Sequence, residues 1–228
     1  AEWGRIDAAT AERLNRARAA GGRVIALTGE HVQAGNSYVG LGAYWSDDLG
    51  QTWNHATGVP DGTNASRLAV DPSNPNIVYA ATGMGLFRSD DAGSTYANVA
   101  LPVSEECAGV TGLGPCQLAN FVTDVVVKEP GGVTAEECSA DGCPVLAAVG
   151  FRSGALPYAD GKPQSPGNGL YRSDNGKAGT FTRVGLLTGE IENATGGLVP
   201  VGFAPQPRIG RIELGHAIGP AQDHNYVY

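Results

Sequence analysis

The sequence is short of charged and aromatic side chains. Only 17% of its 228 residues are charged and 7% are aromatic, and the formal net charge is −8. A basic surface, which nucleic acids and anionic membranes require, is therefore missing. No apolar run reaches the length of a membrane span, so we expect no membrane insertion. These shortages leave proteins and glycans as the expected partners.

Motifs for metal, nucleotide or nucleophile chemistry are also missing. The four histidines are scattered at His31, His55, His216 and His224, without metal-ligand spacing. No phosphate-binding loop and no Gly-x-Ser-x-Gly nucleophile motif occurs. The sequence therefore predicts no metal and no cofactor.

Cysteines number only four and lie in two close pairs. We expect two short disulfides, Cys107–Cys116 and Cys138–Cys143. A zinc site is the alternative, but no Cys-x-x-Cys spacing supports it. Disulfides imply an oxidising compartment, so we expect an extracellular, periplasmic or cell-surface protein. A signal peptide removed before Ala1 would agree with this expectation.

Glycine, in contrast, is abundant at 34 residues, and it marks a repeated motif. "YWSDDLGQTWN" (Tyr44–Asn54) returns as "LFRSDDAGSTYAN" (Leu86–Asn98), and a third, degenerate copy lies in "YRSDNGKAGTF" (Tyr171–Phe181). We expect the acidic and hydroxyl side chains to hold a turn, glycine to take positive φ, and the aromatic ring to be buried. The first box is Ser46, Asp48, Gly50 and Trp53; the second box is Ser89, Asp91, Gly93 and Tyr96; the third box is Ser173, Asn175, Gly179 and Phe181.

The boxes belong to a larger repeat of four short strands in about 40 residues, which is the period of a propeller blade. The sequence predicts an all-β fold, a β-propeller portion of about three and a half four-stranded blades forming an incomplete ring. A short inserted helix is expected near residues 8–20. The expected units are a blade with this helix (1–60), a second blade (61–103), an enlarged blade with two disulfide loops (104–188), and the first half of a further blade (189–228).

A closed ring of six to eight blades needs roughly 250–350 residues. An open arc exposes strand edges and apolar faces, which invites aggregation. We therefore expect a companion chain or segment to carry the remaining blades.

The boxes resemble the Asp-box, or BNR, repeat of sialidases, xyloglucanase-type glycoside hydrolases, sortilin-like receptors and a photosystem II assembly factor. The stretch "DPSNPNIVYAATGMGLFRSDDAGSTY" (Asp71–Tyr96) is most similar to secreted bacterial propellers described as glycosyl hydrolases. The resemblance implies a propeller fold, and by itself it implies no activity.

A glycosidase needs two carboxylates that flank one bond. The candidates are Glu30 and Asp160, in long loops on the expected ligand face, and Asp124, in a strand beside the central channel. None of them lies in a motif that identifies a hydrolase. The sequence therefore favours a secreted or surface-exposed scaffold that binds protein or glycan through its long loops. The alternatives are a polysaccharide-cleaving glycoside hydrolase and an assembly factor for a larger complex.

Overall fold

A computed structural model of the chain contains thirteen β-strands, all in antiparallel sheets, and no helix among its described residues. The predicted helix near residues 8–20, Asp160, and the pair Cys107 and Cys116 lie outside these residues. The described residues are 22–30, 38–102, 121–131, 138–150, 168–184, 189–192, 198–201, 211–219, 221–224 and 227.

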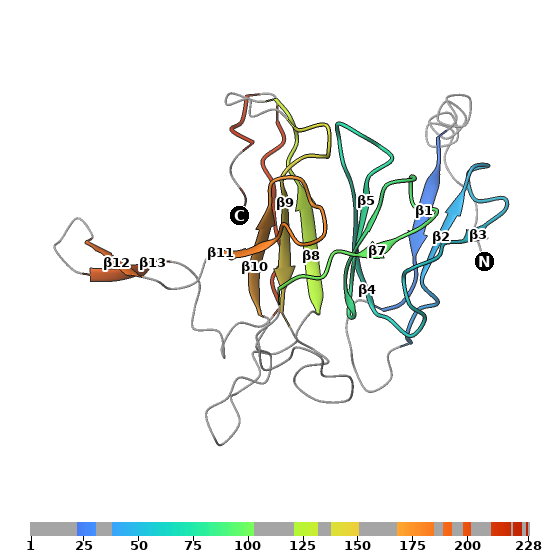
Figure 1. Cartoon of the computed structure of the whole chain (residues 1–228), viewed down its shortest axis with the longest axis horizontal. Helices are drawn as coiled ribbons and strands as arrows, with labels where there is room; N and C mark the ends of the chain where they lie inside the picture. The colour runs from blue at the N-terminus through green and yellow to red at the C-terminus, as the bar shows by residue number, and fades with distance from the viewer. Residues whose placement is uncertain are drawn as a thin grey trace, which may run out of the picture.

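Three sheets stand beside one another like the blades of a fan (Figure 1). The first sheet contains β1 (Val24–Leu27), β2 (Ala43–Ser46) and β3 (Asn54–His55). The second contains β4 (Ala65–Val70), β5 (Val78–Thr82), β6 (Gly85–Ser89) and β7 (Ala97–Asn98). The third contains β8 (Val122–Val127), β9 (Val145–Val149), β10 (Gly169–Ser173) and β11 (Thr182–Val184).

The strand order within the second and third sheets follows the chain, from β4 to β7 and from β8 to β11. This up-and-down order is that of propeller blades, and β4 and β8 pack against each other. The described sheets leave the ring open. The predicted all-β, partial propeller is therefore confirmed, whereas the boundaries of its units remain predictions.

Buried side chains fill the two spaces between the sheets. On β5, Val78 and Ala80 face the first sheet, while Tyr79 and Ala81 face the third. Successive strand residues point to opposite faces, so a strand between two layers is apolar throughout. All five residues of β5 are buried, which explains why "VYAAT" lacks the alternation of a half-exposed strand.

After the third sheet, β12 (Gly189–Glu192) and β13 (Leu198–Val201) pair with each other as a separate hairpin. Pro200 lies opposite Glu190 within β13. Both strands of this two-stranded hairpin are edge strands, where proline is tolerated. Further along, an isolated antiparallel bridge joins His216 to Val227.

Candidate functional site

The first box is a turn held by its own side chains. The Ser46 hydroxyl donates to Asp48 Oδ1 at 2.7 Å and accepts the Gly50 N–H at 2.7 Å. Asp48 also accepts the Thr52 N–H at 2.8 Å and the Thr52 hydroxyl at 2.6 Å. Gly50 has φ of 87°, where a side chain would be strained. Because the turn satisfies its own donors, it needs no external ligand to form.

The second box repeats this geometry closely. Ser89 bridges the Asp91 carboxylate at 2.7 Å and the Gly93 N–H at 2.8 Å. Asp91 accepts both the N–H and the hydroxyl of Thr95 at 2.8 Å. Gly93 has φ of 84°. The same letters in the two copies therefore produce the same hydrogen bonds.

The third box reaches a similar turn with different residues. The Ser173 hydroxyl accepts the Gly176 N–H at 2.7 Å and contacts the Thr180 hydroxyl at 2.6 Å. The Thr180 hydroxyl lies 3.1 Å from Asn175 Oδ1. Gly176 and Gly179 take positive φ, at 68° and 76°. An amide oxygen accepts as a carboxylate does, so the box tolerates Asn in place of Asp.

Hydrogen bonding stabilises the charged form of both box aspartates. Bonds from the Thr52 side chain and N–H, and from Ser46, hold the pKa of Asp48 below its ordinary value of 3.8. Partial burial acts to raise the pKa of Asp91, but bonds from the Thr95 N–H and the Ser89 hydroxyl outweigh it and lower that pKa. Both groups are therefore carboxylates near neutral pH.

The box aromatics are not equivalent. Tyr96 is 7% exposed and Phe181 is 5% exposed, each beneath its hairpin. Trp53 is 43% exposed, and its indole N–H donates to the Gly50 carbonyl at 3.1 Å. The Trp53 ring therefore lies against its own turn but is largely exposed, so the expected burial of the box aromatic is wrong for this copy.

Arg23 connects the first sheet to the second box. Its guanidinium pairs with Asp47 at 2.7 and 3.0 Å and lies 4.1 Å from the ring centre of Trp45. Its Nη1 also donates to the Ser94 hydroxyl at 2.7 Å and approaches the Asp91 carbonyl at 3.3 Å. One side chain thus contacts both sheets.

Arg88 makes the corresponding connection from the second sheet to the third. Its Nη1 donates to the Asn175 carbonyl at 2.5 Å and to the Tyr79 hydroxyl at 3.1 Å. Its Nη2 donates to the Asp141 carbonyl at 2.8 Å and to Asp90 at 2.7 Å. Burial raises the pKa of Tyr79 to about 12, although the positive charge of Arg88 acts to lower it.

A disulfide between Cys138 and Cys143 lies at the same junction. The Cys143 N–H donates to Asp71 Oδ2 at 2.7 Å, which ties the disulfide loop to the second sheet. The predicted Cys138–Cys143 disulfide is therefore present.

A polar pocket of about 320 Å³ lies along the inner strands β4 and β8. Asp124, one of the catalytic candidates, is only 3% exposed. Its Oδ1 accepts the Val125 N–H at 2.8 Å and lies 3.5 Å from Arg67 Nε, while its Oδ2 accepts the Leu214 N–H at 2.8 Å. The pocket is lined by Ser66, Arg67, Thr123, Asp124, Arg211, Glu213 and Leu214.

A second pocket, of about 450 Å³, lies on the loop between β1 and β2. The Thr28 hydroxyl fixes this loop, donating to the Gly42 carbonyl at 2.8 Å and accepting the Leu41 N–H at 2.8 Å. At Gly40 a Cβ would overlap the Thr28 carbonyl, so only glycine fits there.

This loop presents aromatic and apolar side chains to solvent. Tyr38 is 80% exposed and Leu41 is 59% exposed. The Tyr44 ring stacks on His55 with 4.8 Å between ring centres. Glu30, another catalytic candidate, lines the same pocket, and its N–H donates to the Tyr38 carbonyl at 3.1 Å. We name Glu30, Tyr38, Leu41 and Tyr44 the aromatic pocket.

The structure separates the catalytic candidates. Glu30 lines the aromatic pocket and Asp124 lines the polar pocket, so these two do not form a pair. Glu213 is the carboxylate that shares a pocket with Asp124, and the sequence had not singled it out. Tyr38 was also missed, although an aromatic residue in a glycine-rich loop without strand pattern was a usable signal.

Neither a metal centre nor a membrane segment is found in the described part of the chain. No three His, Cys, Asp or Glu side chains there are placed to hold a metal ion. No helix of those residues is long and apolar enough to cross a membrane.

The fold and the repeated turns place the chain in the class of partial β-propellers. No family model matches it. Among curated proteins, it is 40% identical to a xyloglucanase of Hypocrea jecorina over 63 residues, 24% of the chain and 8% of that protein. It is also 82% identical over 27 residues to an S-adenosylmethionine:tRNA ribosyltransferase-isomerase of Rhizorhabdus wittichii, 12% of the chain and 8% of that protein.

The similar solved structures are also matched over only part of their length. A GH74 enzyme of Niastella koreensis matches with a TM-score of 0.41 and 22% identity, covering 78% of this chain and 24% of that one. A GH74 xyloglucanase from Xanthomonas campestris matches with a TM-score of 0.27 and 16% identity, covering 64% and 22%. The chain thus spans less than a tenth of these curated relatives and about a quarter of these structures.

Proposed function

We propose that the chain is part of an Asp-box β-propeller that serves as a binding scaffold for glycans outside the cytoplasm. The aromatic pocket carries this proposal. Aromatic rings stack on the apolar faces of sugars while a nearby polar group bonds to the hydroxyls, and Tyr38, Tyr44 and Glu30 offer this combination. Tyr38 is 80% exposed beside the exposed side chains of Val39 and Leu41, and adjoining exposed apolar groups are typical of ligand-binding surfaces.

Two further observations support the location and the class. The Cys138–Cys143 disulfide favours an oxidising compartment, which supports secretion or display at the surface. The self-satisfied hydrogen bonds of the boxes support the Asp-box assignment and a structural role for these turns.

Binding to soluble polysaccharides tests the proposal. We expect a retarded band in affinity electrophoresis with at least one polysaccharide, tried first with xyloglucan because of the xyloglucanase match. Tyr38→Ala should lower the affinity about ten-fold, since loss of an aromatic contact of this kind removes on the order of 1.4 kcal/mol. Val70→Ala is the matched control, because Val70 is 51% exposed and does not line the aromatic pocket. Equal affinities of the two variants would contradict the proposal.

The second candidate function is glycoside hydrolysis, favoured by the presence of Asp124 and Glu213 in one pocket. A hydrolase needs an acid and a base or nucleophile about 5–10 Å apart on either side of the bond. Against this role, both oxygens of Asp124 already accept backbone N–H groups, which holds the side chain in place. Release of reducing sugar that is lost in both Asp124→Asn and Glu213→Gln would favour the hydrolase over the scaffold.

A further inference from the structure

The same contact joins the first sheet to the second and the second to the third. In each case an arginine of one sheet donates to the box turn of the next: Arg23 to the second box, and Arg88 to the Asn175 carbonyl of the third. A glycine of the contacted box turn also packs closely against the preceding sheet. A Cβ on Gly93 would lie 2.6 Å from Ile25 Cδ1, and one on Gly176 would overlap the Tyr79 hydroxyl.

The strand registers show that the positions that contact the next sheet's box are equivalent in the three sheets. Ile25 pairs with Trp45 in the first sheet, and Tyr79 pairs with Arg88 in the second. In the third sheet the corresponding pair is Leu146 and Arg172. The third sheet therefore repeats the surface with which the second sheet contacts a box, and Arg172 stands at the position of Arg88.

In the described part of the chain, no box turn covers the arginine of this third surface. The Arg172 side chain is 52% exposed, whereas that of Arg88 is 6% exposed. Arg172 Nη2 pairs with Asp174 at 2.8 Å, as Arg88 Nη2 pairs with Asp90 at 2.7 Å. What differs is the box carbonyl: Arg88 contacts one at 2.5 Å, and no such contact of Arg172 is found among the described residues.

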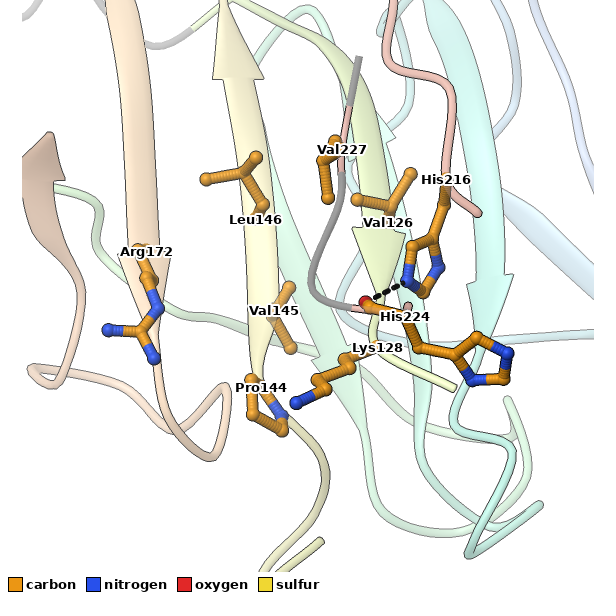
Figure 2. A pocket seen from close by; sticks show the side chains of 9 residues that line it. All are labelled: Val126, Lys128, Pro144, Val145, Leu146, Arg172, His216, His224 and Val227. Atoms are coloured by element: carbon orange, nitrogen blue, oxygen red, sulfur yellow. Dashed lines mark hydrogen bonds between the residues drawn. The ribbon is translucent and has the colours of Figure 1, made fainter. Parts of the chain in front are cut away.

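A cavity of about 230 Å³ lies beside Arg172 (Figure 2). Val126, Val145 and Leu146 form its apolar side, and His216, His224 and Val227 line it from the last segment of the chain. Its volume holds several atoms of a turn, and its lining combines an apolar surface with the cationic side chains of Arg172 and Lys128.

The last segment also carries an isolated antiparallel bridge. The His216–Val227 bridge corresponds to the Val70–Val78 pair of the second sheet. The sequence supports this register, because "NYVY" (Asn225–Tyr228) repeats "NIVY" (Asn76–Tyr79) with one change.

His224 holds this segment in place. Its side chain contacts the Glu129 carbonyl at 3.1 Å and the Gly219 carbonyl at 3.0 Å, and the residue is 4% exposed. Its own carbonyl contacts His216 Nε2 at 2.9 Å, as Figure 2 shows. The segment is thus anchored beside the cavity without filling it.

We propose that this cavity is the seat of a fourth box turn, carried by an Asp-box hairpin on polypeptide outside this chain. The hairpin's first strand adds beside Val227, as an extended segment pairs with an available strand edge. Its box carbonyls accept hydrogen bonds from Arg172, and its apolar side chains cover Leu146. The inference rests on the proposed propeller but not on the proposed glycan ligand.

The test extends the full chain with a hairpin of known box geometry. A copy of residues 80–101 follows Tyr228, so that strand two continues into a third and a fourth strand with a box between them. A second extension carries the same copy with the counterparts of Ser89, Asp91 and Gly93 replaced by Ala, Ala and Val. Amide hydrogen exchange is measured over residues 221–228 and over the added strands.

Over residues 221–228 and the added strands, we expect amide exchange to be about ten-fold slower in the extension with the intact box than in the one with the altered box. Docking of the box into the cavity would oppose local opening of these strands. Arg172→Ala in the intact-box extension should abolish that difference. Arg211→Ala, an exposed arginine that does not line the cavity, should preserve it.

Three results would overturn the inference. They are equal exchange in the two extensions, retained protection in Arg172→Ala, and loss of protection in Arg211→Ala to the same extent. Polysaccharide binding through Tyr38 is measured independently, so a failed docking test and a failed glycan proposal are distinguishable.

Discussion

Replacing Arg88 with alanine should remove a large part of the stability of the described sheets. The Arg88 guanidinium is almost fully buried and makes hydrogen bonds to two backbone carbonyls across the sheet interface, those of Asn175 and Asp141. It also donates to the Tyr79 hydroxyl. Alanine would leave all three oxygens without this donor in a space that water reaches poorly.

The magnitude follows from these bonds. A hydrogen bond from a charged donor contributes about 1.5–3 kcal/mol, and the two carbonyl bonds are of this kind. The pair with Asp90 adds little, because the Asp90 side chain is 72% exposed. Allowing for partial rehydration of the carbonyls, we expect a loss of about 3–4 kcal/mol. A total stability of about 5–15 kcal/mol is typical of a domain, so the effect is large.

Urea unfolding followed by circular dichroism measures this loss. Arg172→Ala is the matched control. Arg172 has the same strand position and a similar acidic neighbour, and it contacts no box carbonyl within the described ranges. It should cost less than about 0.5 kcal/mol, as expected for an exposed ion pair. A loss below about 1 kcal/mol for Arg88→Ala, or equal losses for both variants, would refute the reasoning.

Three further outcomes follow from the turns and the disulfide. Gly93→Ala should lower the free energy of unfolding in urea by about 2–4 kcal/mol, because the added Cβ is strained at positive φ and overlaps the Ile25 side chain of β1. Gly179→Ala is strained at positive φ but meets no neighbour, so it should lower that free energy by about 1 kcal/mol. Replacing Cys138 and Cys143 together by serine should lower the free energy of unfolding by about 2 kcal/mol, because a disulfide that closes so short a loop restricts the unfolded chain by about this much. Thermal unfolding measures the loss. The lowered pKa of Asp91 contributes stability that is complete above pH 3.8 and is lost progressively as the pH falls from there through the lowered pKa. The difference in unfolding free energy between the native chain and Asp91→Asn should therefore shrink in acid, and a constant difference would contradict this.

The repeat made the sheets and the box turns accessible from sequence. In "IVYAAT" (Ile77–Thr82) and "FVTDVVV" (Phe121–Val127), β-branched and aromatic residues stand between turn residues, a pattern typical of strands. The first segment contains β5 of the second sheet, and the second contains β8 of the third sheet. The box hydrogen bonds follow from short polar side chains beside glycine, a local arrangement that needs no knowledge of the rest of the chain.

Contacts between distant segments were not accessible in this way. Arg23 and Arg88 resemble ordinary surface charges in the sequence, because their partners in the next sheet lie 71 and 87 residues away. The aromatic pocket likewise depends on Thr28 and Gly40, which bring Tyr38 close to Tyr44. The β12–β13 hairpin is not evident from the sequence, because glycine and proline interrupt its strand pattern.

The box has a role between sheets as well as within its hairpin. Its serine and acidic side chains bind the N–H groups of the turn, which leaves backbone carbonyls directed at the neighbouring sheet. An arginine that recognises a carbonyl depends on the path of the backbone and not on the side chain attached to it. This explains how the third box, with Asn175 and one extra residue, still receives Arg88. Conversely, a change that alters the backbone path of the turn should disrupt the contact between the two sheets, even when every side chain of the sheet that carries the arginine is intact.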